Sequence, residues 1–408
     1  SNCSSLKEIT IPSSVTTIDS YLFENCKSLE SITIPSSATT IGHGAFFNCS
    51  SLKEITIPSS VTTIGERAFS NCSSLKITTF PSSVTTIGEY IFDRCTSIES
   101  FTIPNSLTKT EKGTFHNCSS LKAITIPSSV TTISEQSFYG CTSLETITIP
   151  SSVTTIEEKS FYGCTSLKIT TIPSSVTTID SYAFCKCTSI ESLTLPNSLT
   201  RTGMGTFSEC SSLETITIPS SITTIDPQSF YGCTSLISIT IPSTVTYVGP
   251  ESFRNCISLE SVTIDAQLKK IEDDVFCQCE SLTKITLPES LTTIGNNSFR
   301  DCSSLEDIVL PNNLEIINSC AFEGCYSLKD IVFSKNLFII NADDFKNCGD
   351  ITLTISTNTY IHPIEEENFD LNIIFLIQRR NYVMINAHSL KQVEKWSFKI
   401  FTHVEHAI

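Results

Sequence analysis

The sequence predicts an α/β repeat solenoid, and three observations support this fold class. A cysteine recurs every 23 residues from Cys3 to Cys348, which divides most of the 408-residue chain into 15 repeats. Each repeat carries apolar residues at the same positions, and no insertion interrupts the register. Self-similarity at a period of about 20 to 50 residues is typical of stacked repeats, in which each unit buries its apolar face against its neighbours. We therefore expect one elongated solenoid over residues 1–348 and a degenerate C-terminal cap over residues 349–408.

The first element of each repeat is expected to be a short strand. In the first full repeat, residues 9–11 read Ile-Thr-Ile, which alternates with a period of two and is rich in β-branched residues. The isoleucines point inward in this pattern, so Thr10 points outward. Pro12 ends the strand because proline cannot donate to a central ladder, and the two serines that follow it form a turn.

The rest of the repeat is expected to be an irregular or 3₁₀-like return segment, followed by one or two helical turns. Its apolar residues fall at Val15, Ile18 and Phe23. The residue before each ladder cysteine is Asn or Gly in most repeats, as at Asn25 and Gly140. Such a residue favours a left-handed conformation that closes a short helix. Stacking should then make a parallel sheet of the strands and an aromatic spine of the phenylalanines.

Residues 349–408 leave the repeat register. Alternating apolar residues predict a strand over 351–355, and a short apolar run predicts another over 372–377. Ser389 followed by Gln392 fits a capping box at the start of a helix. Apolar residues recur on one face of that helix, at Leu390, Val393, Ile400 and Val404. Because atypical terminal units cover the open end of a repeat array, this segment is expected to be the cap.

The repeats follow the pattern LxxIxIPxxVxxIxxxxFxxC, which resembles the BspA-like leucine-rich repeat family from Ser1 to about Cys348. The resemblance implies a leucine-rich-repeat horseshoe, with a parallel β-sheet on the concave face and short helical or 3₁₀ turns on the convex face. It also implies a surface protein of the kind found in bacteria and mucosal protist parasites, with proposed roles in adhesion to host proteins or cells. The family has no catalytic residues to transfer to this chain.

An outward column of threonines is the most regular feature of the predicted sheet. Hydroxyl and methyl groups repeated at a strand spacing of about 4.8 Å could contact an extended peptide, a glycan or ordered water. Threonine is also a good exposed strand residue without any ligand, so both interpretations stay open. The candidate binding residues are Thr56, Thr79, Thr102, Thr125, Thr148, Thr171, Thr194 and Thr217.

Two repeats that lie 92 residues apart depart from the pattern in the same way. Thr78 and Thr170 stand where the inward isoleucine belongs, and an isoleucine lies one position earlier, at Ile77 and Ile169. Either these isoleucines are exposed and form small apolar contact sites, or a local bulge returns them to the core. The recurrence after four repeats indicates that a four-repeat block was copied.

Of the 19 cysteines, 16 occupy the ladder. Neighbouring ladder positions lie within the Cα range of a disulfide, but parallel inward Cβ vectors fit its geometry poorly. We therefore expect buried free thiols that pack as small apolar residues. Cys185, Cys277 and Cys320 fall outside the ladder and are the better candidates for reactive or pairing thiols, the alternative being ordinary, partly exposed cysteines.

Composition and motifs exclude several classes of function. The formal net charge is −16 and basic residues form no cluster, so we expect no nucleic-acid partner. The longest apolar run, residues 373–377, is too short for a transmembrane helix. The histidines are scattered, and the repeats lack a nucleophile, a base and an orienting group, so we expect no enzyme, no cofactor and no metal site. The chain opens within a repeat and without an initiator Met, so we expect a fragment or processed form.

These observations favour a non-enzymatic cell-surface or secreted protein that mediates adhesion or protein binding through its solenoid face. The expected partner is a host protein, host cell or matrix component, with a glycan as a further option. The alternative is an intracellular leucine-rich-repeat scaffold in a reducing compartment, which the many free thiols would also allow.

Overall fold

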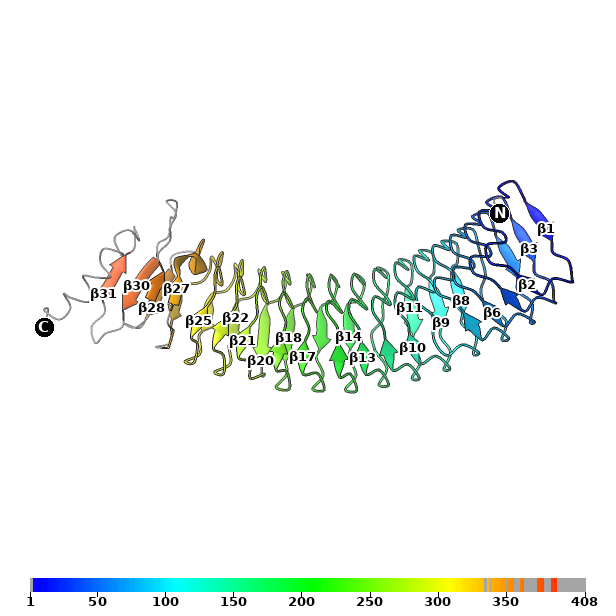
Figure 1. Cartoon of the computed structure of the whole chain (residues 1–408). Coiled ribbons are helices and arrows are strands. Elements are labelled where there is room, and N and C mark those ends of the chain that lie inside the picture. Colours follow the sequence, from blue (N-terminus) through cyan, green and yellow to red (C-terminus); the bar gives the residue numbers. More distant parts are fainter. Residues whose placement is uncertain are drawn as a thin grey trace. The chain divides into compact units, whose positions relative to one another are not determined.

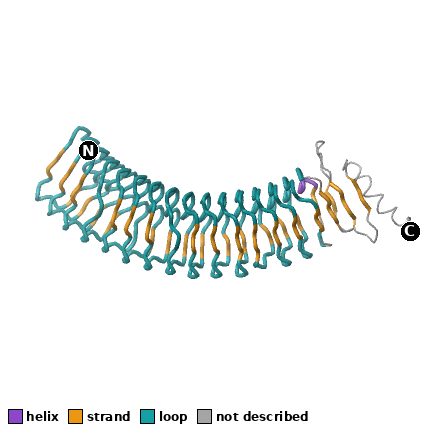
Figure 2. Tube along the Cα trace, turned by 180° about the vertical axis from the view of Figure 1, so that it is seen from behind, coloured by secondary structure: helices purple, strands orange, loops and turns teal. Residues whose placement is uncertain are grey.

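The computed structural model describes residues 3–333, 336–337, 339–348, 351–355, 360–362, 373–377 and 383–386. The chain is a parallel-strand β-solenoid and divides into two compact units, unit 1 (Ser1–Ser221) and unit 2 (Ile222–Ile408). Figure 1 labels strands along each unit, and Figure 2 shows them joined by loops and turns. Most repeats contribute two strands, which we assign to a first and a second rank.

First-rank strands carry the predicted Ile-Thr alternation. In unit 1 they are β1 (Glu8–Thr10), β3 (Ser31–Thr33), β5 (Glu54–Thr56), β8 (Ser100–Thr102), β9 (Ala123–Thr125), β11 (Thr146–Thr148), β14 (Ser192–Thr194) and β16 (Thr215–Thr217). In unit 2 they are β18 (Ser238–Ile241), β20 (Ser261–Ile264), β22 (Lys284–Thr286), β24 (Asp307–Val309), β26 (Asp330–Val332), β28 (Ile351–Ile355) and β30 (Ile373–Ile377).

Second-rank strands follow the proline turn. In unit 1 they are β2 (Thr17–Ile18), β4 (Thr40–Ile41), β6 (Thr63–Ile64), β7 (Thr86–Ile87), β10 (Thr132–Ile133), β12 (Thr155–Ile156), β13 (Thr178–Ile179) and β15 (Arg201–Thr202). In unit 2 they are β17 (Thr224–Ile225), β19 (Tyr247–Val248), β21 (Lys270–Ile271), β23 (Thr293–Ile294), β25 (Ile316–Ile317), β27 (Ile339–Asn341) and β29 (Tyr360–His362). The remaining strand, β31 (Val383–Asn386), pairs antiparallel with β30.

Both ranks pair in parallel with a register of one repeat. In the first rank Ile9 aligns with Ile32, and in the second rank Ile18 aligns with Ile41. The parallel sheet of the first rank is therefore confirmed. The second rank was predicted only as an irregular return, because a strand of two residues is too short to show a period of two.

The predicted helical turns are not found. Among the described residues the one helix is a 3₁₀ segment, η1 (Ala342–Phe345), and the corresponding part of the other repeats consists of turns. In the first repeat the N–H of Glu24 donates to the carbonyl of Tyr21, three residues back, but the N–H of Phe23 donates to Ala45 in the next repeat. Because alternate N–H groups bond to a neighbouring repeat, a continuous helix cannot form.

Two left-handed residues shape each of these turn segments. Asn25 has φ 58° and Asn48 has φ 60°, which confirms the left-handed position predicted before the ladder cysteine. A second left-handed position four residues earlier was not predicted. It holds Tyr21 (φ 57°) and Arg67 (φ 52°), residue types that give no sequence signal for this conformation.

The core of each unit contains the predicted aromatic spine. From Phe23 to Phe207 in unit 1, successive spine rings stack with centroid separations of 5.2–5.9 Å. From Phe230 to Phe345 in unit 2 the separations are 5.3–5.6 Å. Each ring thus buries its faces against the neighbouring repeats, which is how stacking stabilises units that are too small to fold alone.

The ladder cysteines from Cys26 to Cys325 are buried, and the cysteines are free thiols. The thiol of Cys49 donates to the carbonyl of Phe23, with an Sγ–O distance of 3.0 Å, and the same carbonyl accepts the N–H of Cys26 at 3.1 Å. The thiol bond recurs at 3.0–3.2 Å for Cys72, Cys95, Cys118, Cys141, Cys164, Cys187, Cys210, Cys256, Cys279, Cys302, Cys325 and Cys348. The cysteine therefore satisfies the second lone pair of a buried carbonyl as well as filling space.

Two of the three cysteines outside the ladder are also buried. Cys185 and Cys277 are each 3% exposed, and burial raises the pKa of Cys185 to about 11 and that of Cys277 to about 12. The alternative of partly exposed cysteines is therefore wrong for these two residues. Burial and a raised pKa are also the opposite of what a reactive thiol needs. Cys320 is half-buried.

The strands predicted over 351–355 and 372–377 are present as β28 and β30. The predicted helix from Ser389 lies outside the described residues. The assignment of residues 349–408 as a cap stays a prediction.

Candidate interaction surface

The first-rank strands of unit 1 bring the candidate threonines into one exposed column. Strands such as β3 and β8 have an exposed–buried–exposed pattern, because the central apolar residue points into the core. The register aligns Thr102 with Thr125, Thr125 with Thr148, and Thr194 with Thr217. Isolated bridges connect Thr79 and Thr171 to the column. All eight candidates are exposed: Thr56, Thr79, Thr102, Thr125, Thr148, Thr171, Thr194 and Thr217.

The hydroxyls of this column differ in their hydrogen bonding from those of the threonines beside the second rank. Beside the second rank, the Thr39 hydroxyl donates to the Thr16 carbonyl at 3.3 Å, and the same bond recurs for Thr154 and Thr200 at 3.4 and 3.2 Å. In the candidate column, the Thr79 hydroxyl bonds to the Thr102 carbonyl at 3.0 Å. Within the part of the chain that the structure describes, the other seven candidate hydroxyls make no such bond. They are therefore available to a ligand.

The face around the column is built of small, uncharged side chains. The second outward position of each strand lies two residues before the threonine, and it is exposed in β8, β9, β11, β14 and β16. It holds Ser100, Ala123, Thr146, Ser192 and Thr215. We call the outward positions of these five strands, together with Thr171, the hydroxyl face.

A column of charged residues lies just before the first-rank strands. The ammonium of Lys53 lies 2.8 Å from the carboxylate of Glu30, and that of Lys122 lies 3.0 Å from Glu99. Hydrogen bonds from these lysines lower the pKa values of Glu30 and Glu99. These two ion pairs therefore connect neighbouring repeats. Exposed pairs of this kind contribute little stability.

Ile77 and Ile169 do not form the exposed apolar sites that were one of the two predictions. Ile169 is 7% exposed and Ile77 is half-buried, whereas Thr78 and Thr170 are exposed. The first-rank sheet is interrupted at both repeats, since β5 does not pair with β8, nor β11 with β14. Ile169 therefore belongs to the core, whereas Ile77 is only partly covered. Whether a bulge causes this burial stays a prediction.

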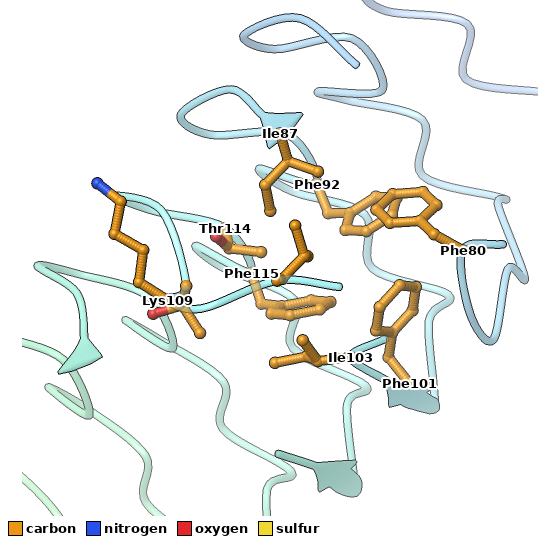
Figure 3. A pocket seen from close by; sticks show the side chains of 10 residues that line it. Phe80, Ile87, Phe92, Phe101, Ile103, Lys109, Thr114 and Phe115 are labelled. Atoms are coloured by element: carbon orange, nitrogen blue, oxygen red, sulfur yellow. The ribbon is translucent and has the colours of Figure 1, made fainter. Parts of the chain in front are cut away.

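A small cavity lies beside the first of these interruptions, since Phe80 lines it. Its volume is about 10 Å³, and Phe80, Phe92, Phe101 and Phe115 contribute to its lining (Figure 3). This is about the space of one water molecule, which would need several polar partners. The hydroxyl of Thr110, which also lines the cavity, lies 2.7 Å from that of Ser137. We interpret the cavity as a packing defect rather than a ligand site.

A second surface feature, which sequence reasoning missed, is a ladder of partly exposed rings on the turn segments of unit 1. The ring of His116 lies 5.7 Å from Tyr90 and 4.8 Å from Tyr139, and Tyr139 stacks on Tyr162 at 4.8 Å. Lys186 lies 5.7 Å from the centre of the Tyr162 ring. The sequence signal would have been His116, Tyr139 and Tyr162, which directly follow spine phenylalanines at 23-residue spacing. Because the ring faces contact one another, mainly edges remain for a partner.

The described residues contain neither a group of three His, Cys, Asp or Glu side chains placed to hold a metal ion nor a helix long and apolar enough to cross a membrane.

Parallel strands stacked every 23 residues over a core of Leu, Phe and Cys, with one strand face exposed, define a leucine-rich-repeat solenoid. This fold is typically a protein-binding scaffold. The chain belongs to the BspA type leucine rich repeat region family, whose model matches residues 1–122, 108–237 and 223–352.

One solved structure agrees with this assignment. The chain is similar to a leucine-rich repeat protein from Bacteroides ovatus, with 30% identity, a TM-score of 0.75, and coverage of 85% of this chain and 91% of that one. It is also similar to a leucine rich cell surface protein from Faecalibacterium prausnitzii, with 26% identity, a TM-score of 0.44, and coverage of 88% and 89%. Among proteins with curated descriptions, none matches this chain.

Proposed function

We propose that this chain is a non-enzymatic adhesion or interaction protein, at a cell surface or outside the cell, that binds a host protein, host cell or matrix component through the hydroxyl face. One observation carries the proposal: threonine hydroxyls in register, without internal hydrogen bonds, on a broad face of small neutral side chains. Membership of a leucine-rich-repeat family supports protein binding as the general role.

The chemistry of the face favours a polar protein segment laid across several rungs. Each threonine offers one donor, one acceptor and a methyl group, and one hydrogen bond contributes about 0.5 to 1.5 kcal/mol net. No deep pocket concentrates binding energy in the described residues, so affinity has to accumulate over many weak contacts. A glycan, whose hydroxyls could pair with the same column, is the second candidate partner.

Binding of the labelled chain to cultured epithelial cells and to immobilised matrix proteins tests this function. We expect saturable binding that is lost when the cells are treated with protease and retained after glycosidase treatment. Binding that is lost only after glycosidase treatment would show that the partner is a glycan and not a protein. No binding to any of these probes would contradict the adhesion role.

The cellular location is tested separately. We expect surface proteolysis of intact source cells to degrade the protein. Full protection in intact cells, with degradation after lysis, would favour the intracellular scaffold instead.

A further inference from the structure

The outward column of the first rank changes character in unit 2. Thr240, Thr263 and Thr286 are exposed, like the column of unit 1. At the next two rungs valine takes this position, and Val309 and Val332 are 59% and 63% exposed. Strand β24 lies beside β26, so the two valines belong to one patch of the sheet face. Neighbouring exposed apolar side chains on a strand face favour a covering element.

The register continues this column beyond Val332, through one threonine, to two further apolar residues. It aligns Val332 with Thr354, Thr354 with Leu376, and Leu376 with Met384. In the alternate column the buried Ile331 aligns with Leu353. Strand β30 reads Ile-Ile-Phe-Leu-Ile and is apolar at both sets of alternate positions. In parallel sheets, strands with a continuous apolar run are those covered on both faces.

The chain supplies a segment of suitable length and pattern directly after β31. Residues 387–408 lie outside the described residues, and their sequence predicts a helix from Ser389. At 100° per residue, Trp396 falls on the same side of this helix as the four predicted apolar residues, and the opposite side holds Lys391, Lys395 and Lys399. A helix over 389–404 would be about 24 Å long. Four strand spacings, from β31 to β24, amount to about 19 Å.

We propose that residues 389–404 form an amphipathic helix that packs on the outward face of β24, β26, β28 and β30. The packed helix adds a second layer to the sheet, which is the usual way in which helix and sheet bury their apolar sides together. It covers Val309 and Val332 and leaves the lysine side in solvent. It also ends the exposed threonine column at Thr286, so the outward face of the last rungs is closed to an external partner. This inference is independent of the proposed function.

Trp396 makes the proposal directly measurable because it is the one tryptophan in the chain. In the full chain we expect a blue-shifted tryptophan emission with weak acrylamide quenching. Replacing both valines, as Val309→Lys with Val332→Lys, should shift the emission to the red and increase quenching. The matched control, Thr240→Lys with Thr263→Lys, places two lysines in the same column of the same unit and should leave both readings unchanged. Circular dichroism checks that both variants are folded.

A reciprocal variant, Ile400→Lys with Val404→Lys, should expose Trp396 in the same way, and it tests the proposal even if the valine variant does not fold. Native emission and quenching equal to those of the urea-denatured chain would overturn the proposal, as would folded variants with unchanged tryptophan signals. Quenching that depends on protein concentration, together with a dimer mass by light scattering, would assign the patch to a second copy and overturn the intramolecular packing.

Discussion

At the scale of single residues, most of the Ser, Thr and Cys content has a structural cause. The Ser37 hydroxyl donates to the Val15 carbonyl of the preceding repeat at 2.6 Å, and the thiol of Cys49 bonds to the Phe23 carbonyl. These side chains satisfy main-chain acceptors that neighbouring repeats leave open. The threonines of the hydroxyl face do not, and this contrast marks them as candidates for function.

The thiol bond gives a first prediction. Replacing Cys141, which is fully buried and donates to the Phe115 carbonyl at 3.1 Å, by alanine removes one hydrogen bond and leaves a small void. We expect Cys141→Ala to lower the free energy of unfolding by about 1 to 2 kcal/mol. Urea denaturation followed by circular dichroism measures this. The exposed Thr125→Ala control should change it by less than about 0.5 kcal/mol. Equal stability of Cys141→Ala and the native chain would show that the thiol bond contributes nothing.

Burial of the thiols predicts a pH dependence. Burial raises the pKa of Cys49 and of Cys256 from 9.0 to about 12. A raised pKa in the folded state means that the stabilising effect is complete below pH 9 and is lost as the pH rises toward 12. We expect the urea concentration at the unfolding midpoint to decrease as the pH is raised from 8 to 10.5. A midpoint unchanged over this range would contradict protonated, buried thiols.

The same burial predicts the outcome of thiol titration. In the native state at pH 8, a thiol reagent should react with few cysteines. After denaturation without reductant, it should titrate at least as many thiols as the 16 ladder positions. Six or more disulfides in the denatured, unreduced chain would refute the free-thiol ladder.

At the scale of elements, the sequence was sufficient for the first-rank strand and insufficient for the rest of the repeat. A period of two places Thr10 outward and Ile9 inward from residue types alone. The second rank and the turn segment depend on hydrogen bonds between repeats, such as that from Phe23 to Ala45, which no local pattern encodes. For the same reason the sequence indicated the hydroxyl face but could not show which hydroxyls were already bonded. Whether Ile169 is exposed or buried depends on packing between repeats, so the sequence alone left both interpretations open.

The close contact between Gly113 and the ring of Tyr90, which lie on neighbouring turn segments, is testable. Gly113 has φ +61°, and a Cβ atom there would lie 2.3 Å from the ring of Tyr90. Gly163, with φ +71°, has no atom closer than 3.9 Å to such a Cβ. We expect Gly163→Ala to cost about 1 kcal/mol through the left-handed conformation alone, and Gly113→Ala to cost clearly more.

The additional cost at Gly113 should come from the ring. In a double-mutant cycle, Tyr90→Ala should therefore recover most of the excess cost of Gly113→Ala. Urea midpoints of the four variants measure the coupling. Additive effects of the two substitutions would show that the ring does not require the glycine.

At the scale of the whole molecule, stability and binding both grow with the number of stacked repeats. Six apolar residues per repeat cannot offset the backbone entropy of 23 residues unless neighbours share the burial. A partner on the hydroxyl face meets the same repetition, since each rung presents the same small set of groups. Losing one rung should therefore weaken binding slightly, and losing several adjacent rungs should abolish it.

The most direct test replaces four neighbouring column threonines of unit 1 by lysine, Thr102, Thr125, Thr148 and Thr171. Its matched control replaces four exposed threonines beside the second rank, Thr131, Thr154, Thr177 and Thr200, again by lysine. Both variants gain the same charge and should stay folded by circular dichroism, because none of the eight side chains is buried. Binding to cultured epithelial cells should be abolished in the first variant and retained in the second. Undiminished binding by the folded first variant would contradict the assignment of the hydroxyl face as the binding site.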